Sequence, residues 1–463
     1  MSSFFMGKLY PIIFAIIISV GHLSELEIYS AAVCIFLAAL AFLTCRSIRP
    51  MLITIPAFIF QVTRAHSPAT PDFSDYYFTE WRLYIVIILG IIAVLSIVFF
   101  IAKNKLYRKL SFTKTRLLIP LLILSVAFLT NGLGAESWTP AALAFGAGQI
   151  LIYLILFLLF YLGFSEEDTK EALVDYFCYV TLIIAYMILV QMAALFISGT
   201  VLSETGAIIK TEIHLGWATC NPLGAILVSL IPMLFYGAMT KRMGWFYFIT
   251  AVLVYIAAVS TCSRNALLFG TITFVACLLV ACFKSSGKKR VVFVAVSVLG
   301  LALVATATII YIDKIRVIFE SFVNQGIDNN GRFNLWGGAW KHFSENTVFG
   351  SGFFSLNDTE VYESIAIMPT AAHNTILEFL YATGGFGLVA YVYYRAETVR
   401  VFLEHPSPLK TMLALATFTV VAESLLDVFV FSFYPMLYPM AALAIACHIN
   451  DVSDRDKLAL PCA

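Results

Sequence analysis

Residues 82–102 read RLYIVIILGIIAVLSIVFFIA and carry no charged side chain after Arg82. About 20 apolar residues in an α-helix are enough to cross the hydrocarbon core of a bilayer, so this run predicts a transmembrane helix. The whole chain has the same character, because 61% of its 463 residues are hydrophobic and only 12% are charged. A soluble domain has about 45–50% apolar and about 25% charged residues. The composition therefore predicts an all-α, polytopic integral membrane protein and excludes a soluble domain.

Further apolar runs bring the expected number of transmembrane helices to about fourteen. They cover residues 8–22, 28–45, 50–63, 82–102, 116–131, 140–163, 173–198, 215–239, 244–262, 265–283, 290–311, 373–394, 410–429 and 432–449. We find no internal repeat and no low-complexity tract, so residues 1–463 are interpreted as a single membrane domain. The sequence after the first run, Gly21-His22-Leu23, lacks the small-residue pattern of a signal-peptide cleavage site, which favours a retained signal anchor.

Lysine and arginine in short loops set the expected orientation. They are concentrated in residues 103–116, 241–242, 284–290 and 395–410, which fall on one side of the membrane if the spans above hold. That side is predicted to be cytoplasmic, and both termini with it. The long connection 312–372 is then extracytoplasmic. We expect it to form a few short helices, since Phe333, Trp336 and Trp340 have helical spacing.

Two arginines are predicted to lie on the extracytoplasmic side. Arg264 occupies a polar break, Ser263-Arg264-Asn265, between two apolar runs, and Arg332 follows Gly331 in the long connection. Arg264 fits either an interfacial cation that reaches lipid phosphates or an anion site, because guanidinium binds phosphate oxygens in pairs. Arg332 fits either a solvated loop charge or the same site. The motif Phe349-Gly350-Ser351-Gly352-Phe353 predicts a tight turn or a close backbone approach to a ligand.

His373 opens the run 373–394 and is followed by Asn374, with Glu378 one helical turn further on. This histidine suits either a structural role at a helix entrance or proton transfer, since imidazole accepts protons near neutral pH. Asn374 and Glu378 are candidate supporting residues.

Two further pairs are candidate supporting residues at the extracytoplasmic ends of their helices. Glu423 and Asp427 are spaced i, i+4, so we expect them to share a helix face and either to balance the arginines or to supply a base. Trp217 and Asn221 have the same spacing and either line a sugar site or only pack.

Several classes of site have no support in the sequence. There is no basic patch for nucleic acid, no Walker motif and no HExxH, and the tight Asp454-Arg455-Asp456 lies in the expected cytoplasmic tail. The nine cysteines are scattered without a CxxC pair and are interpreted as buried hydrophobes. We therefore expect no metal and no cofactor.

Three of these motifs, in this order, resemble the O-antigen ligase and O-antigen polymerase superfamily (WaaL-like and Wzy-like membrane glycosyltransferases). They are Ser263-Arg264, then Gly331-Arg332 with Trp336 and Phe349-Gly350-Ser351-Gly352, then Ala372-His373-Asn374. The resemblance covers roughly residues 210–395. The chain departs from it in having Asn346-Thr347 where the family often has a proline.

The resemblance implies a GT-C-like, metal-independent, inverting glycosyltransferase of the bacterial inner membrane, with its active site on the outer face. Its donor would be an undecaprenyl-diphosphate-linked glycan and its acceptor a glycan or glycolipid. Arg264 and Arg332 would bind the diphosphate, His373 would assist the acceptor hydroxyl, and the connection 312–372 would close over the sugars.

Three functions remain open on this basis. About fourteen spans exceed the dozen usual for the ligases, which favours a repeat-unit polymerase for a surface polysaccharide. A ligase that transfers finished glycan to lipid A-core or another acceptor shares the same donor chemistry. A transporter of lipid-linked glycans belongs to another class and would often show an internal repeat and charges near the midplane.

Overall fold

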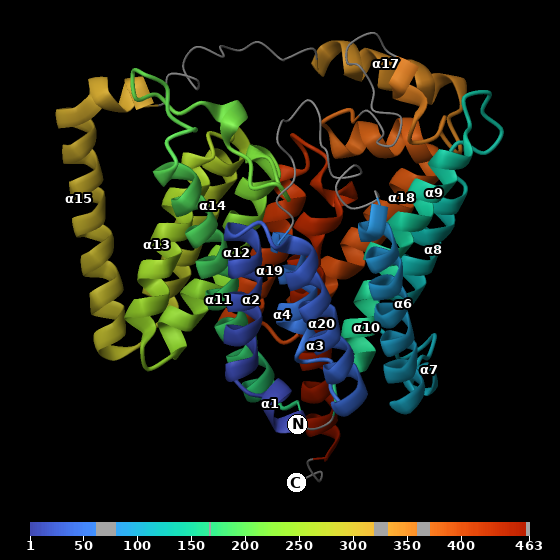
Figure 1. Cartoon of the computed structure of the whole chain (residues 1–463), viewed down its shortest axis with the longest axis horizontal. Helices are drawn as coiled ribbons and strands as arrows, with labels where there is room; N and C mark the ends of the chain where they lie inside the picture. The colour runs from blue at the N-terminus through green and yellow to red at the C-terminus, as the bar shows by residue number, and fades with distance from the viewer. Residues whose placement is uncertain (62–79, 166–167, 319–331, 359–370, 460–463) are drawn as a thin grey trace. The chain divides into compact units, whose positions relative to one another are not determined.

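The computed structural model describes residues 1–61, 80–165, 168–318, 332–358 and 371–459. Within these ranges the chain is helical, and its β pairing is confined to the isolated bridges Leu202–Ile208 and His214–Thr219 (Figure 1). Seven helices in the described residues are long and apolar enough to cross a membrane, and four more apolar helices are shorter. The prediction of an all-α, multi-pass membrane protein is confirmed. Each expected span overlaps a helix, but the count of about fourteen crossings stays a prediction.

The described residues form two compact units, and we describe each by itself. The first unit comprises Met1–Tyr107, Gly163–Gly326 and Thr411–Thr419. Its helices are α1 (Ser2–Met6), α2 (Leu9–Leu23), α3 (Glu27–Thr44), α4 (Met51–Phe58), α6 (Glu80–Lys103), α11 (Lys170–Ile197), α12 (Cys220–Thr240), α13 (Gly244–Ser260), α14 (Arg264–Lys284) and α15 (Gly287–Ile318). The most buried of its spans is α12, which packs against both α13 and α14.

Lys289 and the helix start at Arg264 lie at opposite ends of α12. Beyond the end of α12, the Lys289 Nζ donates hydrogen bonds to the carbonyls of Met239, at 2.8 Å, and of Lys241, at 3.1 Å. At the other end of α12, Gly224 lies against Ala266, in the first turn of α14, which Arg264 begins. That these two ends face opposite sides of the membrane stays a prediction.

The second unit comprises Arg108–Leu162, Ile327–Lys410 and Val420–Ala463. Its helices are α8 (Leu118–Leu129), α9 (Pro140–Ile150), the π-helical η2 (Leu151–Leu156), α10 (Phe157–Gly163, whose last residue belongs to the first unit), α17 (Arg332–Glu345), α18 (Thr375–Leu403) and α20 (Phe433–Ala459). The short α7 (Leu106–Lys109) and α19 (Pro408–Glu423) belong partly to each unit. Helix α17 confirms the helical spacing expected from Phe333, Trp336 and Trp340.

An aromatic cluster forms the core of the second unit. Phe379 of α18 lies 4.7 Å from Phe431 and 6.1 Å from Phe128, measured between ring centroids, and Phe353 lies 5.4 Å from Phe431. Aromatic rings at such separations stabilise one another beyond the apolar area that they bury. Phe353 is the last residue of the Gly-x-Gly motif, so the cluster anchors that motif in the core.

Helix α18 is broken at Gly384, which has φ +70° and ψ −170°. The amides of Gly385 and Phe386 donate to the carbonyls of Thr347 and Val348, at 2.8 and 3.2 Å, rather than to their helical partners four residues back. The freed carbonyls of Tyr381 and Ala382 accept instead from the amides of Ser351 and Gly352, at 2.6 and 3.2 Å. The segment 347–352 therefore replaces the hydrogen bonds that the helix lacks.

Two glycines make this close approach possible. A Cβ on Gly384 would lie 2.2 Å from the Val348 carbonyl oxygen, and one on Gly350 would lie 2.6 Å from that of Tyr381. Both residues have positive φ, which side chains disfavour. The close approach expected from the Gly-x-Gly motif is thus to the backbone of α18. Gly384 breaks the helix at this approach.

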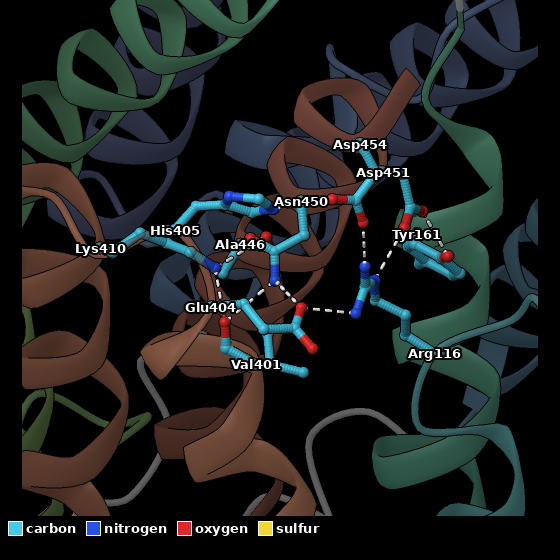
Figure 2. Close-up of polar contacts among 10 residues, drawn as sticks. All are labelled: Arg116, Tyr161, Val401, Glu404, His405, Lys410, Ala446, Asn450, Asp451 and Asp454. Atoms are coloured by element: carbon cyan, nitrogen blue, oxygen red, sulfur yellow. Dashed lines mark hydrogen bonds and ion pairs between the residues drawn. The ribbon is translucent and has the colours of Figure 1, made fainter. Parts of the chain in front are cut away.

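A charged cluster connects helices of the second unit near the C-terminal ends of α18 and α20 (Figure 2). The Arg116 guanidinium donates to Glu404 Oε2 at 2.5 Å, to Asp451 Oδ1 at 2.8 Å and to Asp454 Oδ2 at 2.8 Å. Tyr161 also donates to Asp451, at 2.5 Å. Partial burial of the guanidinium opposes its charge, but the hydrogen bond to Asp451 and the nearby Glu404 and Asp451 carboxylates outweigh this and raise the pKa of Arg116.

The same cluster contains a histidine–aspartate pair. His405 Nε2 lies 2.8 Å from Asp454 Oδ1, and the buried Lys410 Nζ donates to the carbonyls of Val401 and Ala446, at 2.7 and 3.1 Å (Figure 2). These contacts fix the ends of α18 and α20 and the start of α19. They lie far from His373, since the 19 residues of α18 after its break, Gly385–Leu403, separate them and an α-helix rises about 1.5 Å per residue.

Two expected helix limits were wrong. Helix α12 begins at Cys220 rather than at residue 215, because Gly216 has φ +76° and Pro222 suits the first turn of a helix. Helix α19 ends at Glu423 rather than at residue 429, because the Ser424 carbonyl accepts from the amide and hydroxyl of Thr375. Helix α15 runs to Ile318 but is kinked at Tyr311, where φ is −114° and ψ is 20°, so the break falls where the connection was expected to begin.

The eight cysteines in the described ranges are free thiols, which agrees with their interpretation as hydrophobes. Gly331 lies outside the described residues, as do residues 319–330 and 359–370 of the long connection.

Candidate functional site

His373 precedes α18 and is held in a left-handed conformation, with φ +50°. The helix itself starts with the N-cap Asn374, whose Oδ1 accepts from the amides of Ile376 and Leu377 at 3.0 and 3.1 Å. The expectation that His373 lies at a helix entrance is correct, although it lies one residue outside the cap. A left-handed conformation is costly for a residue with a Cβ and persists only where its surroundings hold it.

The imidazole of His373 is paired with a carboxylate. His373 Nδ1 lies 3.0 Å from Asp427 Oδ1, and the same oxygen accepts from the amide of Val428 at 2.9 Å. The His373 side chain is 35% exposed, whereas that of Asp427 is only 8% exposed. The carboxylate is therefore covered by the protein while the imidazole still reaches the surface.

This pairing determines which nitrogen of His373 is able to accept a proton. A carboxylate only accepts hydrogen bonds, so Nδ1 carries the hydrogen and donates it to Asp427. In the neutral imidazole, Nε2 then has its lone pair free. The pair has the arrangement of a general base with an orienting carboxylate.

Asp427 is held in place from α18. The hydroxyl of Thr375, two residues after His373, donates to the Ser424 carbonyl at 2.6 Å, and its amide donates to the same oxygen at 3.1 Å. Asp427 lies in the turn after α19, so the expectation that it shares a helix face with Glu423 was wrong.

The two arginines belong to different units. Arg332 is the first residue of α17 in the second unit, and Arg264 is the first residue of α14 in the first unit. Neither guanidinium forms an ion pair with a carboxylate in the part of the chain that the structure describes. The second unit brings together His373, Asp427, Glu378 and the helix of Arg332. That Arg264 joins them in one pocket stays a prediction.

One segment of the chain matches a known protein family. Residues 246–392 match the family model described as Wzy_C: O-Antigen ligase. This segment belongs to the Wzy_C family. The expected resemblance is thereby confirmed for residues 246–392, and this segment is of the O-antigen ligase/polymerase type. A search of curated proteins found no match.

The Wzy_C segment contains most of the candidate residues but not all. Arg264, Arg332, His373 and Glu378 fall inside it, whereas Asp427 lies 35 residues beyond its end at residue 392 (427 − 392). The partner of His373 is thus supplied by a part of the chain that the family match does not cover.

Asn374 and Glu378 of the Wzy_C segment have structural partners. Asn374 caps α18, as described above. Glu378 is buried, and its two carboxylate oxygens accept from the amide of Ala372, at 2.8 Å, and from the hydroxyl of Tyr381, at 2.7 Å. Its side chain therefore faces the turn that carries His373.

Glu423 also lies beyond the Wzy_C segment and is fully buried. No described residue donates a hydrogen bond to either of its carboxylate oxygens. Burial without a donor is unfavourable for a charged carboxylate. Within the described ranges Glu423 therefore does not balance an arginine.

Trp217 precedes the Wzy_C segment and has a packing role. Its indole Nε1 donates to Gln191 Oε1 at 2.7 Å, and its ring centroid lies 4.4 Å from that of Phe60. Because Trp217 comes before α12 begins, the expectation that it shares a helix face with Asn221 was wrong. Asn221 lies in the first turn of α12, half-buried beside Cys220.

In the described part of the chain, no three His, Cys, Asp or Glu side chains lie close enough to bind one metal ion.

Proposed function

We propose that this protein is a repeat-unit polymerase, which transfers an undecaprenyl-diphosphate-linked glycan to the hydroxyl of an acceptor sugar on a growing surface polysaccharide. The observation that carries the proposal is the His373–Asp427 pair, 3.0 Å apart, in which His373 belongs to the Wzy_C segment. It supplies an oriented general base at the half-exposed start of α18.

The proposed reaction is one displacement at the anomeric carbon of the donor. His373 Nε2 accepts the proton of the acceptor hydroxyl as its oxygen forms the new glycosidic bond. The bond between the anomeric carbon and the diphosphate oxygen breaks, and undecaprenyl diphosphate leaves with the electron pair. Asp427 stabilises the imidazolium that results, and attack from the side opposite the leaving group inverts the anomeric configuration.

Arg264 and Arg332 would bind the departing diphosphate. A guanidinium stays protonated and binds two phosphate oxygens at once, so fixed arginines suit a leaving group that gains negative charge. Both lack a carboxylate partner in the described residues, which leaves their charge available to an anion. The reaction would then proceed without a metal or a cofactor.

A ligase that transfers finished glycan to lipid A-core is the second candidate, because the matching family model is described as an O-antigen ligase. The two reactions share the donor and differ in the acceptor. Transfer to a lipid-linked repeat unit produces a ladder of products, whereas transfer to lipid A-core produces one addition per acceptor.

The test uses the full chain in proteoliposomes with undecaprenyl-diphosphate-linked repeat units. His373→Ala should lower the initial rate of undecaprenyl diphosphate release by about 10²–10⁴-fold, the usual contribution of a general base. His405→Gln is the matched control, since His405 is also paired with an aspartate, at the far end of α18, and it should keep the wild-type rate. A His373→Ala protein that elongates glycan at the wild-type rate would overturn the proposal. Elongation absent with repeat units but present with lipid A-core would replace polymerase by ligase.

A further inference from the structure

The peptide that precedes His373 is held on both sides. The amide of Ala372 donates to Glu378 Oε2 at 2.8 Å, and its carbonyl accepts from Trp336 Nε1 at 2.9 Å. Ala372 is itself fully buried. The residue before the proposed base is therefore fixed by one hydrogen bond from α18 and one from α17.

Both oxygens of the Glu378 carboxylate accept hydrogen bonds inside the protein. Its side chain is 2% exposed, and its second oxygen accepts from the Tyr381 hydroxyl at 2.7 Å. Tyr381 is also fully buried, and its carbonyl binds the segment 347–352 at the break in α18. With both oxygens engaged inside the protein, Glu378 acts on the turn rather than on a substrate.

Trp336 connects the turn to the proposed anion-binding helix. It lies four residues, or about one helical turn, after Arg332 on α17. Arg332 and His373 are thus linked through three steps: one turn of α17, the indole hydrogen bond, and one peptide unit. All of these residues belong to the second unit.

This link matters because the backbone of His373 is strained. A residue with a Cβ at φ +50° relaxes unless its neighbours hold it. Relaxation would rotate the imidazole away from Asp427 and move Nε2. Displacements of about 1 Å in a reacting group are known to lower rates by about 10²-fold.

We propose that Trp336 and Glu378 are positioning residues that hold His373 in its left-handed turn and in register with Arg332. The proposal rests on the proposed function, because it assigns them to the base of that reaction. Their loss lowers turnover and leaves the affinity for the lipid-linked donor in place.

The test is a steady-state comparison of kcat and KM in proteoliposomes. Trp336→Phe removes the Nε1–H and keeps an aromatic ring, and Glu378→Leu removes both acceptors. Each should lower kcat by about 10–100-fold with KM for the donor unchanged. Glu378→Gln should recover most of the rate, because the amide oxygen still accepts from Ala372 and the amide nitrogen donates to the Tyr381 oxygen.

Matched controls come from the same helices. Trp340→Phe, four residues further along α17, changes an indole that is 57% exposed, and Glu397→Gln changes a carboxylate of α18 that pairs with Arg400. Both should keep the wild-type kcat. If Glu378→Leu does not yield a monodisperse protein, Trp336→Phe and Glu378→Gln still decide the outcome.

Three results would overturn the inference: wild-type kcat in Trp336→Phe, a Glu378→Gln rate as low as that of Glu378→Leu, or a loss expressed in KM alone. Failure of the proposed function has a different signature. In that case His373→Ala itself keeps the wild-type rate.

Discussion

Arg264 and Arg332 hold the same position in their helices, because each is the first residue, one of α14 and the other of α17. The N-terminus of a helix carries a partial positive charge that disfavours a cation and favours an anion. Neither arginine forms an ion pair with a carboxylate in the described ranges. Within the described residues both guanidinium groups thus lack a carboxylate partner, which would suit the binding of an anion.

Arg264→Lys and Arg332→Lys should each lower the rate of glycan transfer by roughly 10²-fold, because an ammonium cannot bind two phosphate oxygens in a plane. The measurement is the initial rate of undecaprenyl diphosphate release. Arg400→Lys is the control, since the Arg400 side chain is 72% exposed and lies near the end of α18. Full activity in both test variants would show that a generic positive charge suffices.

Asp427→Asn should lower kcat by roughly 10²-fold or more, because an amide is able to donate to Nδ1 and stabilise the wrong tautomer of His373. The readout is kcat in the same proteoliposomes. Asp454→Asn, which changes the partner of His405, is the matched control. Equal rates for Asp427→Asn and the wild type would remove the orienting role of Asp427.

Chelation should leave the reaction unaffected if two arginines carry the charge of the diphosphate. The initial rate after extensive dialysis against EDTA should equal the untreated rate. A loss that added Mg²⁺ restores would contradict the metal-independent reaction.

Gly384→Ala should destabilise the protein by roughly 2–4 kcal/mol, since the new Cβ would lie 2.2 Å from the Val348 carbonyl oxygen at a residue with positive φ. The measurement is the fall in melting temperature of the detergent-solubilised protein relative to the wild type. Gly385→Ala is the neighbouring control, because its Cβ would lie 3.4 Å from the nearest atom, the Thr347 oxygen. Equal melting temperatures for the two variants would show that segment 347–352 yields easily.

Arg116→Ala should also lower the melting temperature, because it leaves the Glu404, Asp451 and Asp454 carboxylates close together without their shared cation. The loss should be about 1–3 kcal/mol and near the lower figure, since the carboxylates are partly exposed. Adding Asp451→Asn should recover part of it by reducing the repulsion. Arg400→Ala, which breaks an exposed pair, is the control.

The positions of the helices were largely predictable from the sequence, because each apolar run reports local chemistry. Helix limits were less predictable. Pro222 was a signal for the late start of α12, but nothing local marks the end of α19, which depends on Thr375 binding the Ser424 carbonyl. Contacts between distant segments set such limits.

The roles of the candidate residues stay predictions, although the sequence marks where these residues lie. His373, Arg264 and Arg332 stand in short motifs, and the Wzy_C match covers all three. The pairing of His373 with Asp427 was not foreseen, because 54 residues separate them and no periodicity relates their positions. The hydrogen bond from Trp336 to Ala372 escaped prediction for the same reason.

The break in α18 has a consequence for biosynthesis. Ribosomes make the segment 347–352 before they make Tyr381–Phe386, so the partner segment already exists when the interrupted helix emerges. The open amides and carbonyls of that helix are able to pair as soon as they leave the translocation machinery. The amides and carbonyls at the break in α18 therefore do not have to contact lipid without a hydrogen-bond partner while the protein is assembled.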